Sequence, residues 1–302
     1  MSVVIANAPC SYGAFELTVG VDPAVPSPVA LLDAVAQAGY RGVDLGPVGY
    51  LGTGAELGDR LGARGLALAG GYIEIAFSAP GGVTDALAVL DRTLDAFDAA
   101  PAGAAPARPT IADAGSPERF AAPGRAVTDR SLGLDDAGWR RLANGLALVV
   151  ERCRERGYEP TFHHHVGTYV EAPWEIERLL ERSDVGLCLD IGHLEVVGED
   201  PLVALERWGE RINHVHVKDT DRAVVAGVLA QGLAVDALWQ RRAFGRLGEH
   251  DGRVAAFVEA VVGSGYEGWI VVEQDVFPDA DDPDRPRRDQ IANREFLRGV
   301  GL

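Results

Sequence analysis

Residues able to do metal and acid–base chemistry gather in the second half of this sequence. Six of the seven histidines lie between residues 163 and 216, whereas the first 150 residues contain none. They form three clusters, and an acidic cluster follows: 163–165 (HHH), 190–193 (DIGH), 214–216 (HVH) and 273–275 (EQD). Imidazole nitrogens mixed with carboxylate oxygens suit Mn²⁺, Co²⁺, Zn²⁺ or Fe²⁺. The four clusters therefore predict a metal site, provided that the fold brings them together.

Side-chain alternation along a strand decides which of these histidines share a face. It places His163 and His165 on one face of their strand and His164 on the other, and it places His214 and His216 together. Any one of them alone is as often a hydrogen-bonded core residue as a ligand. Six histidines at consecutive strand ends favour the metal site.

The elements that must position these clusters alternate between strand and helix. Short apolar or β-branched runs predict eight strands, at 3–8, 41–46, 66–75, 108–113, 160–165, 185–190, 212–219 and 269–274. Amphipathic segments predict helices at 28–38, 55–65, 83–99, 135–156, 173–182, 201–208, 253–262 and 289–298. This alternation predicts an α/β fold, a (β/α)8 TIM barrel, with functional residues at the carboxyl ends of its strands. A doubly wound sheet is disfavoured because no GxGxxG turn follows the first strand. We expect one domain over residues 1–302, with a C-terminal helical tail.

Composition excludes several function classes. The 302 residues include 28 Lys+Arg and 45 Asp+Glu, a net charge of −17, which argues against nucleic acid as a partner. The start of the sequence lacks the features of a signal peptide, and no apolar run approaches the ~18–20 residues of a membrane span. Three widely spaced cysteines, Cys10, Cys153 and Cys188, predict reduced thiols in a cytoplasmic protein. Cys10 and Cys188 are expected to be buried and inert.

Several motifs resemble one known group of barrels. AQAGYRGVDLG, LCLDIGHLEVVGEDP, HVHVKD and VVEQD are similar to motifs of the sugar phosphate isomerase/epimerase superfamily, the xylose isomerase-like TIM barrels. Within that superfamily, FHHHVGTYVE, LCLDIGH, GPVGYLG and LGEHDG are most similar to the myo-inosose-2 dehydratases. The resemblance extends over nearly the whole chain.

This resemblance implies one divalent metal ion at the top of the barrel. Read onto this sequence, the metal ligands are Asp190, His216, Glu273 and, where many relatives carry a glutamate, His163. Mn²⁺ or Co²⁺ is the expected ion, with Zn²⁺, Fe²⁺ or Mg²⁺ as alternatives. The resemblance also implies a homodimer or a homotetramer.

The same resemblance implies residues that bind a small polyhydroxylated ketone. The histidine of the LDxGH motif is His193, and an arginine that contacts substrate in ketose epimerases corresponds to Arg222. Lys218, after the HVH motif, and Glu249, in a loop that resembles one at the active-site mouth, are further candidates for substrate binding. Lys218 could equally form an ordinary surface ion pair. Tyr72, at the end of the third strand, is a candidate for the pocket wall.

The replacement of a glutamate by His163 bears on the mechanism. Ketose 3-epimerases of this superfamily use two metal-bound glutamates as bases, and this chain keeps only Glu273. We therefore expect a metal-dependent lyase that removes water from a keto-inositol through an enediolate, with Glu273 removing the α-proton. His165 or His193 would protonate the departing hydroxyl. The alternatives are a ketose isomerase or epimerase and β-elimination from a 3-keto sugar or keto-glycoside. A DNA-repair endonuclease and a non-enzymatic sugar-binding barrel are disfavoured.

Overall fold

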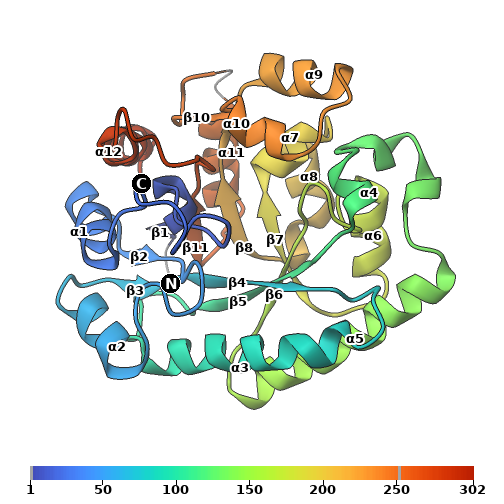
Figure 1. Ribbon diagram of the computed structural model, residues 1–302, viewed down its shortest axis with the longest axis horizontal. Helices are drawn as coiled ribbons and strands as arrows, with labels where there is room; N and C mark the ends of the chain where they lie inside the picture. Colours follow the sequence, from blue (N-terminus) through green and yellow to red (C-terminus); the bar gives the residue numbers. More distant parts are fainter. Residues whose placement is uncertain (1–2, 251–252) are drawn as a thin grey trace.

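Parallel strands form a nearly closed barrel surrounded by helices in the computed structural model, which describes residues 3–250 and 253–302 (Figure 1). Neighbouring strands follow the order β3 (Ala67–Leu68), β2 (Gly42–Val43), β1 (Val4–Asn7), β11 (Trp269–Val272), β8 (Ile212–Val217), β7 (Gly186–Asp190), β6 (Thr161–His163), β5 (Arg108–Asp113) and β4 (Gly70–Ile75). All of these neighbours pair in parallel. The predicted TIM barrel is confirmed.

One predicted strand, at 66–75, is two strands in the structure, β3 and β4. These are the first and the last strand in the order of the sheet, so the barrel is open between them. Its first part, β3, pairs with β2, and its second part, β4, pairs with β5. Ala69 joins them: its N–H donates to the carbonyl of Val43 (3.0 Å), and its carbonyl accepts from the N–H of Arg108 (2.9 Å). Ala69 therefore links β3 to β4 and hydrogen-bonds to the segments on both sides of the opening.

Helices cover the outside of the barrel. Those that correspond to predicted helices are α1 (Pro28–Ala38), α2 (Gly54–Gly62), α3 (Gly82–Ala99), α5 (Asp136–Glu155), α6 (Pro173–Leu180), α8 (Pro201–Trp208), α11 (Arg253–Gly263) and α12 (Arg285–Gly299). Local signals fix their ends; for example, Ser27 caps α1, and Gly39 ends it in the left-handed region at φ 92°. In the described part of the chain, no helix is both long enough and apolar enough to cross a membrane.

The segments after the strands contain elements that the sequence analysis did not predict. They are the short helices α4 (Pro117–Phe120), α7 (Ile191–Val196), α9 (Arg222–Ala230) and α10 (Asp236–Gln240), and the antiparallel pair β9 (Asp219–Thr220) and β10 (Phe244–Gly245). Figure 1 shows α7, α9 and α10 gathered at one end of the barrel, beyond the ends of β7 and β8.

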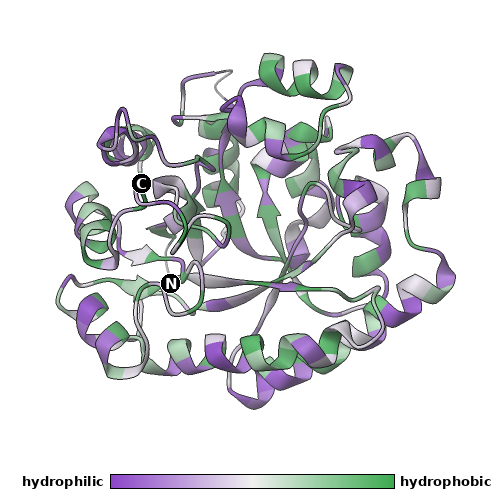
Figure 2. Ribbon diagram, in the orientation of Figure 1, coloured by the Kyte–Doolittle hydropathy of each residue, from purple (hydrophilic) through white to green (hydrophobic). Residues whose placement is uncertain are grey.

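Alternation in the strands separates an apolar layer from a polar interior. In β8, Val215 and Val217 belong to the main hydrophobic core, whereas His214 and His216, which alternate with them, do not, although all four are buried. The same alternation occurs in β7, where Leu187 and Leu189 belong to that core. The surrounding helices carry both hydrophobic and polar residues, as expected of elements with one face on the barrel (Figure 2). The polar interior contains the candidate site.

Candidate metal centre

Four potential ligands meet at the carboxyl ends of four neighbouring strands. His163 ends β6, Asp190 ends β7, His216 lies near the end of β8, and Glu273 directly follows β11. The sheet register sets Asp190 beside His216. One nitrogen or carboxylate oxygen from each of the four residues lies within 4.8 Å of all the others. The structure therefore brings together all four of the predicted ligands.

Asp190 lies at the centre of this group because its two carboxylate oxygens have different surroundings. Its Oδ1 accepts hydrogen bonds from the N–H groups of Gly192 (2.8 Å) and His193 (3.2 Å), so that it caps α7. Its Oδ2 lies 3.4 Å from His163 Nε2 and 3.7 Å from His216 Nδ1. The cap holds the carboxylate in place and leaves Oδ2 directed at the histidines.

His164 directly follows β6, and its ring lies nearly parallel to that of His163, with the centroids 6.0 Å apart. Its Nε2 accepts a hydrogen bond from the backbone N–H of Asp190 (3.2 Å). This contact joins the ends of β6 and β7. His164 is thus a supporting residue of the site.

Lys218 lies inside the site and is only 2% exposed. Its Nζ lies 2.8 Å from Glu273 Oε2, 3.0 Å from Asp190 Oδ2 and 3.1 Å from Asp275 Oδ2. Burial lowers the pKa of Lys218, but the three carboxylates outweigh burial and hold this pKa well above its ordinary value. In the same way, Lys218 helps to keep the pKa of Asp190 and that of Glu273 low, against the effect of burial. The surface ion pair that was the alternative for Lys218 is not what the structure shows.

The donor set fits a divalent cation. The carboxylates of Asp190, Glu273 and Asp275, whose side chains are 0%, 11% and 16% exposed, face one ammonium group, so the ionised carboxylates exceed this ammonium by two charges. Asp190 Oδ2 and both ring nitrogens of His216 are buried and have no well-aligned hydrogen bond within the described residues. Buried polar atoms are rarely left in this state unless an ion or a water completes them. Nitrogen and carboxylate ligands of this kind suit first-row divalent metals.

Two further histidines lie beside the ligand group. The ring centroids of His165 and His193 are 3.9 Å apart, and His193 Nε2 lies 3.2 Å from Lys218 Nζ. Burial lowers the pKa of His165 to about 3, and burial also holds the pKa of His193 well below its ordinary value. The ring of Tyr72, from β4, lies 6.2 Å from that of His165. These residues form one wall of the site.

A buried ion cluster supports the loop that carries His165. Arg119, in α4, forms a bidentate pair with Glu175 at 3.0 and 2.9 Å and lies 3.6 Å from Glu171. Glu171 in turn accepts hydrogen bonds from the N–H groups of Gly124 and Gly167. The cluster therefore joins the loop after β5 to the loop after β6.

Two predicted substrate-binding residues lie away from the ligand group. Arg222 is 44% exposed and extends to Glu195, 3.3 Å away. Glu249 is 43% exposed and pairs with Arg246. The last two residues of the LGEHDG motif, 251–252, lie outside the described part of the chain. Of the predicted substrate-binding residues, His193 and Lys218 are the two that lie within the site.

Three residues line or support the site without having been given that role by the sequence analysis, which named Asp275 within the acidic cluster 273–275 and expected Cys188 to be inert. Asp275 contacts Lys218, Cys188 lies between His163 and His216, and Asp44 Oδ2 lies 3.7 Å from His216 Nε2. Cys188 and Asp275 are each two positions from a predicted ligand, so strand alternation could have found them. Asp44 stands in the quoted motif GYRGVDLG, and burial raises its pKa to about 7.

The fold agrees with the comparison to known families. A family model described as a xylose isomerase-like TIM barrel matches residues 32–298. The chain belongs to this xylose isomerase-like TIM barrel family. The resemblance seen in the sequence motifs is thereby confirmed at the level of the family.

Relatives of this xylose isomerase-like barrel include enzymes of two kinds. The inosose dehydratase of Lacticaseibacillus casei is 36% identical over 157 residues, which cover 51% of this chain and 53% of the relative, so the match spans about half of each. A zinc-bound IOLI protein superposes with a TM-score of 0.69 at 10% identity and covers 98% of this chain and 97% of its own. An L-ribulose 3-epimerase gives a TM-score of 0.67 at 15% identity, with 99% and 94% covered. At these identities, the two solved structures show the fold alone.

Proposed function

We propose that this protein is a metal-dependent hydro-lyase that removes water from a keto-inositol. The observation that carries the proposal is the set of four converging residues, His163, Asp190, His216 and Glu273. The family resemblance implies that His163 stands where many relatives carry a second basic glutamate. The 36% identity to an inosose dehydratase supports the same reaction class. Three free cysteines within the chain support a reducing, cytoplasmic location.

His163, Asp190, His216 and Glu273 would hold the metal ion. When bound there, a divalent ion supplies a Lewis acid that polarises a carbonyl and stabilises negative charge on its oxygen. Mn²⁺ and Co²⁺ suit this mixture of nitrogen and oxygen ligands. The ion would also bring the buried charges of the site close to balance, since three carboxylates would face one ammonium group and one divalent cation.

The surrounding side chains supply the proton transfers. Glu273, whose pKa is held low by His216 and Lys218 despite its burial, is ionised and acts as the base for the proton α to the carbonyl. His193 is the group that protonates the departing hydroxyl, because its Nε2 lies 3.2 Å from the Lys218 ammonium, which can replace the proton. His165, 3.9 Å from His193 between ring centroids, orients the hydroxyl groups of the substrate.

A ketose isomerase or epimerase is the second candidate. The structural likeness to an L-ribulose 3-epimerase favours it, although that likeness extends to the fold alone. Against it, Glu273 is the one glutamate among the four converging residues, whereas the epimerases that this chain resembles use two metal-bound glutamates for two-sided proton exchange.

Proton NMR in D2O distinguishes the two reactions. The metal-reconstituted protein is incubated with scyllo-inosose, D-fructose or D-psicose, beside a His163→Ala variant whose fold is checked by circular dichroism. We expect a dehydrated dione from the inosose, unchanged ketoses and an inactive variant. Deuterium incorporation into a ketose with formation of its epimer, together with unchanged inosose, would refute the lyase proposal and support the alternative.

A further inference from the structure

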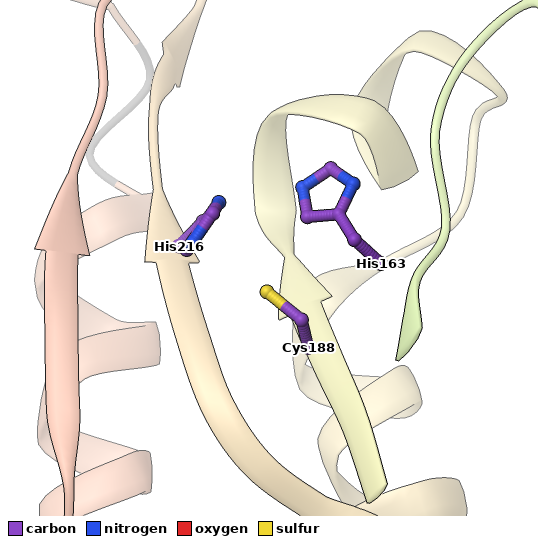
Figure 3. A group of neighbouring side chains, drawn as sticks. All are labelled: His163, Cys188 and His216. Atoms are coloured by element: carbon purple, nitrogen blue, oxygen red, sulfur yellow. The ribbon is translucent and has the colours of Figure 1, made fainter. Parts of the chain in front are cut away.

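Cys188 lies below Asp190 and beside His163, two of the proposed metal ligands. It belongs to β7, two residues before Asp190 and therefore on the same face of the strand, about 6–7 Å lower along the barrel. Its sheet partner on β6 is His163. The Cys188 sulfur, one ring nitrogen of His163 and one of His216 lie within 4.8 Å of one another. Figure 3 shows the three side chains, from β6, β7 and β8, directed at a common space.

The surroundings of Cys188 differ from those of an inert core cysteine. An inert cysteine is packed among apolar side chains, but two imidazole rings flank this one. All three residues are almost fully buried, with exposures of 0% for Cys188, 2% for His163 and 3% for His216. Neither ring nitrogen of His216 has a well-aligned hydrogen bond within the described residues. Carboxylate oxygens of Glu273 and Asp44 lie 3.1 and 3.7 Å from these two nitrogens, and the sulfur of Cys188 lies within 4.8 Å of one of them, so a metal ion bound here would complete the coordination of this buried ring.

We propose that Cys188, His163 and His216 form a second binding position for thiophilic cations such as Zn²⁺ and Cd²⁺. We call this the lower position, and we call the group of His163, Asp190, His216 and Glu273 the upper position. The lower position uses the same two histidines but has the sulfur of Cys188 in place of the oxygens of Asp190 and Glu273. Thiolate ligands select soft cations, whereas carboxylates suit harder ions such as Mn²⁺. The two positions overlap, so one ion occupies one of them at a time, and the identity of the ion decides which.

Binding at the lower position is a simple exchange of a proton for a metal ion. The Cys188 S–H bond breaks, its proton is released to solvent, and the sulfur lone pair forms the bond to the cation. No electron is transferred. An ion held at this depth is withdrawn from Lys218 and Glu273, so a thiophilic ion inhibits any chemistry that depends on the upper position. The binding site itself does not depend on the proposed function.

Co²⁺ absorption tests the proposal without an activity assay, because sulfur ligation adds intense charge-transfer bands in the near ultraviolet. Metal-free protein is titrated with Co²⁺ and, separately, with Cd²⁺ against a competing chelator. The variants are Cys188→Ser, Cys10→Ala and Cys153→Ala. Cys10 is the necessary control because its sulfur lies within 4.8 Å of oxygens of Glu273 and Asp275. Cys153, buried in α5, controls for the loss of a thiol elsewhere.

We expect the sulfur bands with Cd²⁺ and, to a lesser extent, with Co²⁺, and we expect Cys188→Ser alone to abolish them. The Cd²⁺ affinity of that variant should fall about tenfold or more, with Mn²⁺ affinity nearly unchanged. Sulfur bands that persist in Cys188→Ser but disappear in Cys10→Ala would overturn the proposal. So would equal Cd²⁺ affinities in Cys188→Ser and the unmodified protein. Both of these measurements detect metal binding and not turnover, so their outcome can be told apart from failure of the proposed lyase reaction.

Discussion

The Lys218 ammonium lies 3.0 Å from Asp190 Oδ2, the oxygen that also faces His163 and His216. The carboxylate of Asp190 would therefore neutralise both the Lys218 ammonium and the proposed metal ion. Like charges repel one another, and the repulsion is greater for a divalent ion than for a monovalent one. In the proposed reaction, Lys218 would therefore weaken metal binding while it serves the proton transfers.

Replacing Lys218 by methionine should separate these two effects. We expect Lys218→Met to bind Mn²⁺ about tenfold more tightly, because the repulsion is removed. Turnover should fall by about 10²-fold or more, the usual contribution of one proton-transfer group. Isothermal titration with Mn²⁺ and steady-state kinetics measure the two quantities. Weaker metal binding in Lys218→Met would contradict this repulsion between Lys218 and the ion.

Two glutamine substitutions distinguish a ligand from a proton-transfer residue. His163→Gln should lower metal affinity, because His163 is one of the four converging ligands. His193→Gln should retain the metal but lose about 10²–10⁴-fold in turnover, since His193 contacts Lys218 and lies outside that group. Metal content after gel filtration, set beside turnover, checks both. Loss of the metal from His193→Gln would reassign this residue as a ligand.

Asp44 should act on the metal through His216. His216 directs Nδ1 at Glu273 (3.1 Å) and Nε2 at Asp44 (3.7 Å), the arrangement in which a carboxylate orients a ligating histidine. We expect Asp44→Asn to lower Mn²⁺ affinity by about 10–100-fold, and Asp44→Glu to restore part of it. Unchanged affinity in Asp44→Asn, measured by chelator competition, would show that the carboxylate does not support the histidine.

Glu171 should make stability depend on pH. Burial raises the pKa of Glu171 from 4.5 to about 7, despite the neighbouring Arg119. Because the folded-state pKa exceeds the unfolded one, this group stabilises the fold fully below about pH 4.5, and the contribution is lost as pH rises through 7. Glu171→Gln removes the titration, so its stability relative to the unmodified protein should increase by about 1–3 kcal/mol between pH 5 and pH 8. Urea unfolding at both pH values measures this difference, and a constant difference would contradict the shift.

The sequence predicted the barrel well because each strand combines an apolar run with a clear turn or helix at its end. The prediction was poorest where a polar side chain determines the structure that follows. The helix α7 is an example: it begins directly after Asp190, whose carboxylate caps it through Gly192 and His193. The same carboxylate had been interpreted only as a ligand, so the strand-to-helix junction was missed.

The candidate site was predicted in part for a similar reason. Strand alternation brings His163, Asp190 and His216 together, and it applies equally to Lys218, two residues beyond His216. Lys218 is nevertheless buried among carboxylates from β7 and from the segment after β11, and this environment depends on the closure of the barrel. Arg222 was predicted to bind substrate because of its spacing from the HVH motif. In the structure its side chain instead extends to Glu195.

The distribution of ligands around the barrel separates two tasks. All four ligand residues come from the contiguous arc of β6, β7, β8 and β11, whereas Tyr72 on β4 contributes to the wall beside them. If the proposed function holds, the strands that would hold the ion differ from the strand that would contact the substrate. Substitutions at Tyr72 and its neighbours on β4 and β5 should then change which substrate is accepted and leave the proposed metal ligands unchanged.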